Sequence, residues 1–214
     1  MPFLVRSLLY LNVLVLCSST AARYTLIIES PCNVHNPGRV TDDCFEYNII
    51  QKFATQLQTS LELYGPTLTV LNHTTRNYQT SDERIQNINK CNPDIVIVIS
   101  CCQRNAPETA CISFGCMPTD KTTQDIVPIK QIHKHYSALN RVCIEHFYTT
   151  CAKKLNVRNW TTYKPLAAPF TQLTGINSTA LHIELGLTDN NQWRLFVKPL
   201  MQAITEWVDY VQRI

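Results

Sequence analysis

Cysteine is the most reactive residue type in this 214-residue chain, which contains ten of them. Cys17 lies in an apolar segment near the N-terminus, and the others follow it. In an oxidising compartment most of these are expected to pair as disulfides, with one thiol left over from an odd count. A zinc site competes with this interpretation, but the chain has no C-x-x-C repeat, so disulfides are favoured. The cysteines after the apolar segment are Cys32, Cys44, Cys91, Cys101, Cys102, Cys111, Cys116, Cys143 and Cys151.

Ser100, His182 and Glu184 have the residue types of a hydrolase triad. Side chains alternate along a strand, so His182 and Glu184 are expected to share one strand face. The nucleophilic serine of α/β-hydrolases lies in a tight turn between glycines, and no glycine flanks Ser100. We therefore do not predict a serine hydrolase. The five glycines are also too dispersed for a nucleotide phosphate loop.

Residues 1–22 are typical of a secretory signal peptide, because Arg6 precedes a short apolar run and small residues follow that run. The run is too short to cross a bilayer, and no later stretch approaches membrane length. Residues 23–214 are expected to be a single domain outside the cytosol. Three N-glycosylation sequons begin at Asn72, Asn159 and Asn177, a number that chance alone could give. Together with the leader and the cysteines they favour a eukaryotic secretory route, for a cellular or a viral gene.

The composition is that of a globular domain, with 45% hydrophobic and 16% charged residues. A net charge of +3 is too small to indicate a nucleic-acid partner. Strand and helix patterns alternate, which predicts an α/β fold: a three-layer sandwich with a mostly parallel central sheet and helices on both faces. The expected strands are 24–29, 67–71, 95–100, 110–114 and 180–185. The expected helices are one started by Asp42 or Asp43 and extending to about Leu61, then 82–89, 129–155 and 199–211, with Pro199 in the first turn of the last.

Several segments occur in an order that resembles a known family. They are the loop Glu29-Ser30-Pro31-Cys32-Asn33-Val34-His35-Asn36-Pro37-Gly38, the helix start Phe45-Glu46, the stretch Asp82-Glu83-Arg84, Asp94 before the third strand, and His182-Ile183-Glu184-Leu185-Gly186. Together they resemble a divergent zinc-dependent N-acetylmuramoyl-L-alanine amidase, an enzyme that cleaves peptidoglycan between muramic acid and the stem peptide. The resemblance covers nearly the whole mature chain and implies the same α/β fold.

This resemblance implies roles for four residues. Cys32 and Ser100 occupy the places of the family's two zinc-binding histidines, and Glu46 occupies the place of the third ligand. Glu184 corresponds to the glutamate that acts on the zinc-bound water, so here it would be a remnant general base. A hydrolytic zinc needs three protein ligands and one open position for water, so we expect zinc catalysis to be lost.

Other interpretations of the same residues stay open. His35 and His182 are candidate replacement ligands for a rebuilt zinc site. Glu46, three residues after Asp43, is equally explained as part of a capping box at the helix start. Glu184 is alternatively a buried remnant bound to backbone amides.

The favoured interpretation is a secreted, disulfide-bonded glycoprotein with an amidase-like fold that is catalytically inactive and works by binding. The expected partner is an extracellular protein or glycan: a cell-wall fragment, a host or immune protein, or a subunit held covalently through the unpaired cysteine. No cofactor is expected then, whereas zinc belongs to the alternative, an active divergent amidase with a rebuilt metal site.

Two structural expectations follow from the resemblance. Cys32, Glu46, Ser100 and Glu184 should converge at one end of the sheet, because neighbouring parallel strands end in one crevice. A disulfide should replace the metal as a link between these segments, joining Cys32 to Cys44, Cys101 or Cys102.

Overall fold

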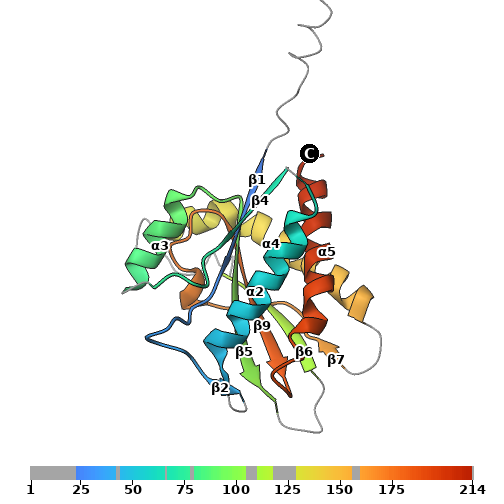
Figure 1. The fold of residues 1–214 in the computed structure, drawn as a ribbon. Coiled ribbons are helices and arrows are strands. Elements are labelled where there is room, and N and C mark those ends of the chain that lie inside the picture. Colours follow the sequence, from blue (N-terminus) through green and yellow to red (C-terminus); the bar gives the residue numbers. More distant parts are fainter. Residues whose placement is uncertain are drawn as a thin grey trace, which may run out of the picture.

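A seven-stranded, mostly parallel sheet forms the centre of the molecule (Figure 1). The computed structural model describes residues 23–41, 44–65, 67–77, 80–104, 110–117, 129–155 and 160–213. The sheet has the order β4-β1-β5-β9-β6-β7, with β8 also paired to β6, and only the β6–β9 pair is antiparallel. These strands are β1 (Tyr24–Glu29), β4 (Leu68–Asn72), β5 (Ile95–Gln103), β6 (Ala110–Cys116), β7 (Trp160–Thr162), β8 (Leu166–Ala167) and β9 (Thr179–Leu187).

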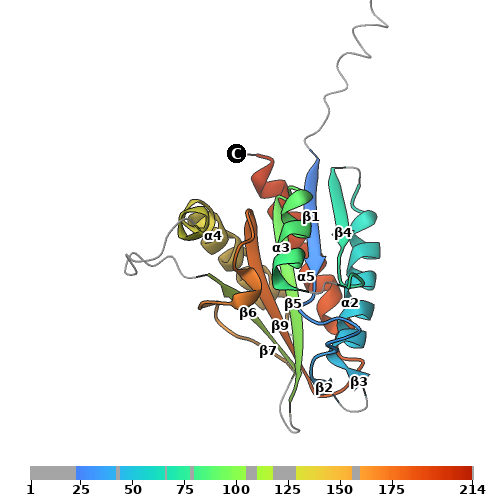
Figure 2. The ribbon, with the colours of Figure 1, turned by 90° about the vertical axis from the view of Figure 1, so that its left-hand side faces the viewer.

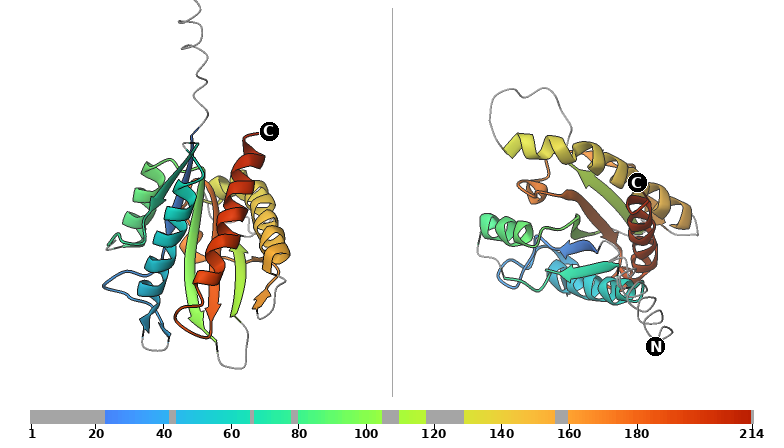
Figure 3. Two further views of the ribbon diagram at one scale, coloured as in Figure 1. Left: turned by 45° about the vertical axis from the view of Figure 1, so that its right-hand side comes forward. Right: turned by 90° about the horizontal axis from the view of Figure 1, so that it is seen from above.

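Three helices cover one face of this sheet (Figures 2 and 3). They are α2 (Glu46–Glu62), α4 (Ile129–Leu155) and α5 (Arg194–Val211). The apolar stripe of α2, which includes the fully buried Phe53, packs with Trp207 of α5 and Phe147 of α4 into the main core. Each buried side chain of this size contributes roughly 1.5–3 kcal/mol. This continuous apolar layer therefore holds the strands in place.

The opposite face is apolar over only part of its length. Helix α3 (Ser81–Lys90) and the 3₁₀ turn η1 (Thr171–Leu173) cover Val96 and Val98 there, through Ile88 and Leu173. Farther along the same strands the side chains on this face are polar. The sandwich with helices on both faces agrees with the fold class expected from the sequence.

Two helix starts differ from the sequence-based expectation. Helix α5 begins at Arg194, so Pro199 lies inside it rather than in its first turn. Proline removes one N–H bond to the carbonyl of Leu195, and Leu195 is exposed, where water can satisfy that carbonyl. Helix α2 begins at Glu46 with Phe45 as its N-cap, directly after the short hairpin β2 (Val40–Thr41) and β3 (Cys44–Phe45). Asp42 and Asp43 lie outside the described residues, as do residues 1–22.

The nine cysteines after Cys17 all lie within the described residues, and every one carries a free thiol. The disulfide framework expected from the sequence thus stays a prediction. Cys102 and Cys111 both flank Gly186, so they are two strand spacings apart. Their Cα atoms are therefore about 9.5 Å apart, which exceeds the Cα–Cα limit of roughly 7 Å for a disulfide.

Among the described helices, none has the length and apolar character that crossing a membrane requires.

Candidate functional site

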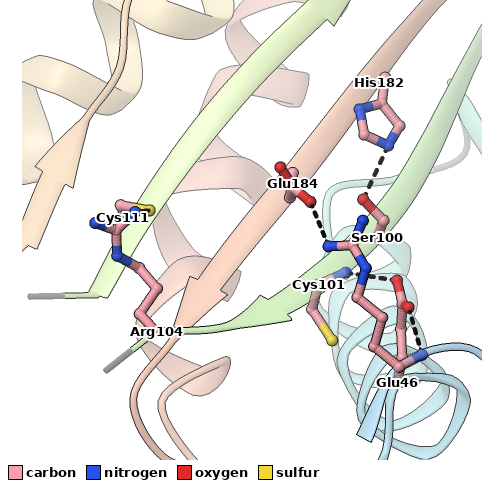
Figure 4. Close-up of polar contacts among 8 residues, drawn as sticks. Glu46, Ser100, Cys101, Arg104, Cys111, His182 and Glu184 are labelled. Atoms are coloured by element: carbon pink, nitrogen blue, oxygen red, sulfur yellow. Dashed lines mark hydrogen bonds and ion pairs between the residues drawn. The ribbon is translucent and has the colours of Figure 1, made fainter. Parts of the chain in front are cut away.

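The uncovered part of the sheet presents polar side chains where β5 and β9 approach their ends (Figure 4). Ser100 on β5 is in register with Glu184 on β9, which is in register with Ser113 on β6. Residues in register point to the same face, and so do residues two positions away. Cys102 and His182 therefore belong to this group as well. The result is a polar surface on three adjacent strands.

Glu46 lies at the edge of this surface, at the first turn of α2. Its Oε1 accepts a hydrogen bond from the backbone N–H of Cys101 at 2.9 Å, and its Oε2 accepts one from the N–H of Arg39 at 3.1 Å. The Cys32 thiol also hydrogen-bonds to this carboxylate. The capping-box interpretation is wrong, because Glu46 is the first helical residue, Phe45 is the N-cap, and the backbone N–H of Glu46 donates to the carbonyl of Arg39. The carboxylate instead joins the loop between β1 and α2 to strand β5.

Cys32 is held beside Glu46 as a neutral thiol. Burial, and then the negative charge of Glu46, raises the pKa of Cys32 to about 12. Gly38 makes this close approach possible, because it has φ +78° and an added Cβ would lie 2.5 Å from the Cys32 Sγ and 2.6 Å from the Glu46 Oε2. No other residue type fits this position without displacing one of these groups.

Arg39 links the two glutamates of the site. Its Nη1 donates to the Glu184 Oε1 at 3.1 Å. The guanidinium also interacts electrostatically with Glu46 and Cys102. A protein cation therefore lies among the groups to which the resemblance assigned a metal. Sequence reasoning missed Arg39, and its only signal is that it directly follows the Pro37-Gly38 loop.

Ser100 and His182 form a buried pair, with the Ser100 Oγ 2.9 Å from the His182 Nε2. Burial lowers the pKa of His182, and the carboxylate of Glu184 opposes that shift. The imidazole stacks on Phe170 at 5.0 Å between ring centroids and 26° between planes. The carboxylate of Glu184 hydrogen-bonds to Arg39 rather than to His182. The described contacts thus give a serine–histidine pair without the third group of a hydrolase triad.

A second arginine borders the polar surface on its far side. Arg104 donates from Nη1 to the Cys111 Sγ at 3.3 Å and lies over the Tyr163 ring at 5.8 Å. The Cys111 sulfur lies above Gly186, where any side chain would collide with it. Sequence reasoning had paired Gly186 only with Glu184 and did not identify Arg104.

The structure separates the remaining predicted site residues. His35 is exposed in the β1–α2 loop, on a pocket that does not include Glu46. Asn177 is exposed, whereas Asn72 is partly buried and its Oδ1 accepts from the Thr74 hydroxyl at 2.7 Å. Asn159 lies outside the described residues.

The four residues to which the resemblance gave roles therefore lie around one end of the sheet, as it implied; they are Cys32, Glu46, Ser100 and Glu184. They nevertheless form two separate sets of contacts. Cys32 contacts Glu46, and Ser100 contacts His182, while Arg39 joins Glu46 to Glu184. Among the described residues no three side chains of His, Cys, Asp or Glu are grouped so that they could hold a metal ion.

Comparisons with known proteins identify the fold. No protein-family model matches this chain, and no curated protein sequence matches it. Among solved structures, an N-acetylmuramoyl-L-alanine amidase from Clostridium difficile 630 is similar, with a TM-score of 0.65 and 15% identity over 87% of this chain and 97% of its own. An amidase of Nostoc punctiforme has a TM-score of 0.64 and 13% identity over 90% and 99%. The Clostridioides difficile amidase CwlD, in complex with the GerS lipoprotein, has a TM-score of 0.51 and 17% identity over 89% and 96%. The chain therefore has the fold of N-acetylmuramoyl-L-alanine amidases.

Proposed function

We propose that this protein is a secreted binding protein that uses the amidase fold without zinc-dependent hydrolysis. The observation that carries the proposal is the position of Arg39, whose guanidinium bonds to Glu184 and lies close to Glu46. A positive guanidinium there repels a second cation and occupies the carboxylate that would act on a metal-bound water.

The state of the other donors supports the same conclusion. Both oxygens of Glu46 already accept a backbone N–H bond, so each has only one further lone pair to offer a metal. Thiolate is the form of cysteine that binds metals, and burial raises the pKa of Cys32 to about 12, so binding a metal there would require the loss of a proton from a buried thiol. The Ser100 hydroxyl, a poor zinc ligand in any state, bonds to His182. These donors do not fit a hydrolytic zinc.

The chemistry outside this site fits an extracellular binding role. The leader over residues 1–22 and the sequon at the exposed Asn177 support secretion and glycosylation. The partner is a protein or glycan, and one amidase of this fold is solved in complex with a lipoprotein, which shows that the fold can carry a protein interface. Nine cysteines in an oxidising compartment support disulfide bonding and a covalent partner through an unpaired thiol.

Metal content and hydrolysis test this proposal. The mature protein, folded in an oxidising compartment, is expected to contain far less than one zinc per chain and to leave peptidoglycan intact with or without a chelator. Restoring both histidines, by Cys32→His with Ser100→His, is the minimum change expected to recover zinc binding.

A matched control combines Cys32→His with Ser113→His. Ser113 lies in register with Glu184 but one strand beyond it, so its histidine is on the side away from Glu46 and should recover no zinc. Stoichiometric zinc in the unmodified protein, together with chelator-sensitive cleavage of muramoyl-peptide bonds, would overturn the proposal. That result would establish the alternative, an active amidase with a rebuilt metal site.

A further inference from the structure

A polar pocket of about 490 Å³ lies between the loop after β1 and the start of α3. Its lining comes from residues 30–36 of that loop and from residues 76–77 and 80–84, segments that lie beside each other in Figures 1 and 2. Of the site described above, only Cys32 reaches this pocket. The pocket is at the carboxyl ends of β1 and β4, the edge where α/β sheets bind ligands.

The charged side chains that line the pocket are both arginines. Among the described residues, no aspartate or glutamate lines it. Arg84 is nearly buried and is fixed by bonds from Nε to the Glu29 Oε1 at 2.7 Å and from Nη2 to a backbone carbonyl. A guanidinium has more N–H donors than these two bonds use, so donors remain for a ligand.

Arg76 supplies the charge that the Arg84–Glu29 pair does not neutralise. It is exposed on the pocket wall, and its side chain forms no ion pair with any carboxylate in the described part of the chain. Glu29 is fully buried beneath Arg84 and offsets only that arginine. The pocket therefore has an excess positive charge, which Arg76 supplies beside the fixed guanidinium of Arg84.

Several acceptor oxygens of the lining are already occupied. The Asn33 Oδ1 accepts the N–H groups of His35 and Asn36, each at 2.9 Å. The Ser30 Oγ accepts the N–H of Cys32 at 3.1 Å, and the Thr80 Oγ1 accepts the N–H of Glu83 at 3.2 Å. The contacts of the described residues leave as donors the amide NH₂ of Asn33, the Arg76 guanidinium and the remaining N–H groups of Arg84. The pocket lining thus offers a ligand more hydrogen-bond donors than acceptors.

We propose that this pocket binds an oxyanion, the carboxylate or phosphate group of a small acidic ligand. The proposal rests on the binding function proposed above and deepens it by naming the chemical class of the ligand. A planar or tetrahedral oxyanion matches two guanidinium groups and an amide donor. The cavity is large enough for such a group with a small organic part, as ligand pockets of 300–1,000 Å³ commonly are.

Calorimetric titration of the intact mature protein at low salt tests this inference, with inorganic phosphate and citrate as probes and glycerol as the neutral comparison. Phosphate or citrate is expected to bind, with an affinity that falls as salt increases, and the stronger of the two identifies phosphate or carboxylate as the preferred group. Arg76→Gln is expected to weaken binding at least fivefold. Arg194→Gln removes the same charge from an exposed residue on α5, across the sheet, and should leave the affinity unchanged.

The inference is overturned if neither anion binds at millimolar concentration to folded protein, or if the two arginine variants lose affinity equally. Circular dichroism of each variant verifies folding. Failure of this inference can be distinguished from failure of the proposed function. A zinc-containing, hydrolytic protein that still binds phosphate through Arg76 would refute the proposed function and leave the anion pocket standing.

Discussion

Replacing Glu46 distinguishes a structural carboxylate from a metal ligand. In the structure this side chain accepts two backbone N–H groups, and the bond from the Cys101 N–H is buried. Hydrogen bonds to a charged group contribute roughly 1.5–3 kcal/mol each, and a buried unsatisfied donor costs a similar amount. We therefore expect Glu46→Ala to lower the free energy of unfolding by about 3 kcal/mol.

Urea denaturation followed by circular dichroism, with and without EDTA, measures this effect. EDTA should not change the unfolding midpoint of the unmodified protein. Glu46→Gln keeps one carbonyl oxygen for the Cys101 N–H, so its loss should be smaller than that of Glu46→Ala. Glu62→Ala removes an exposed carboxylate at the other end of α2 and should change stability by less than about 0.5 kcal/mol.

One result would refute this reasoning. If EDTA destabilises the unmodified protein to the level of Glu46→Ala, and has no effect on Glu46→Ala itself, then Glu46 acts by binding a metal. Stability would in that case come from metal binding rather than from hydrogen bonds to the backbone.

Three further predictions concern the same region and the pH response. Gly38→Ala should lower the free energy of unfolding by more than about 1 kcal/mol, because the new Cβ clashes with its neighbours at a residue whose φ is positive. Gly65→Ala should cost less, because its added Cβ meets no atom within 4 Å. Equal losses in urea denaturation would contradict the clash. Burial, and then a nearby arginine, lowers the pKa of His73 to about 4. Between about pH 6.5 and pH 4 this side chain is therefore protonated in the unfolded chain but neutral in the folded one, so the free energy of unfolding should fall as the pH decreases over that range. A His73→Asn variant should flatten the dependence of the urea midpoint on pH, and an unchanged slope would count against this assignment. The thiols of Cys32 and Cys101 interact electrostatically with each other and with the Glu46 carboxylate, so in protein from an oxidising compartment they are the pair expected to form the linking disulfide. Non-reducing peptide mapping that finds Cys32 free would contradict this prediction.

Features that depend on local patterns were predictable from the sequence. The strand Tyr24–Glu29 and the helix Ile129–Leu155 agree with their expected bounds, because apolar periodicity reports directly which face of an element is buried. Alternation along a strand also places His182 and Glu184 on one face without knowledge of the fold. The start of α5 was missed because proline is tolerated inside a helix where water can satisfy the freed carbonyl, and here that carbonyl belongs to Leu195, an exposed residue.

The partners of the site residues were decided by the tertiary structure alone. Arg39 and Glu184 are 145 positions apart, and Glu46 and Cys101 are 55 apart, so no local pattern relates them. The resemblance assigned Glu46 and Glu184 to one site, but the groups that each carboxylate contacts depend on where the loop between β1 and α2 folds. In this chain the loop brings an arginine to that place, because Gly38 lets the backbone turn closely over Cys32 and Glu46. The sequence therefore determines the scaffold and the chemical groups, while the fold determines that a guanidinium lies between the two glutamates.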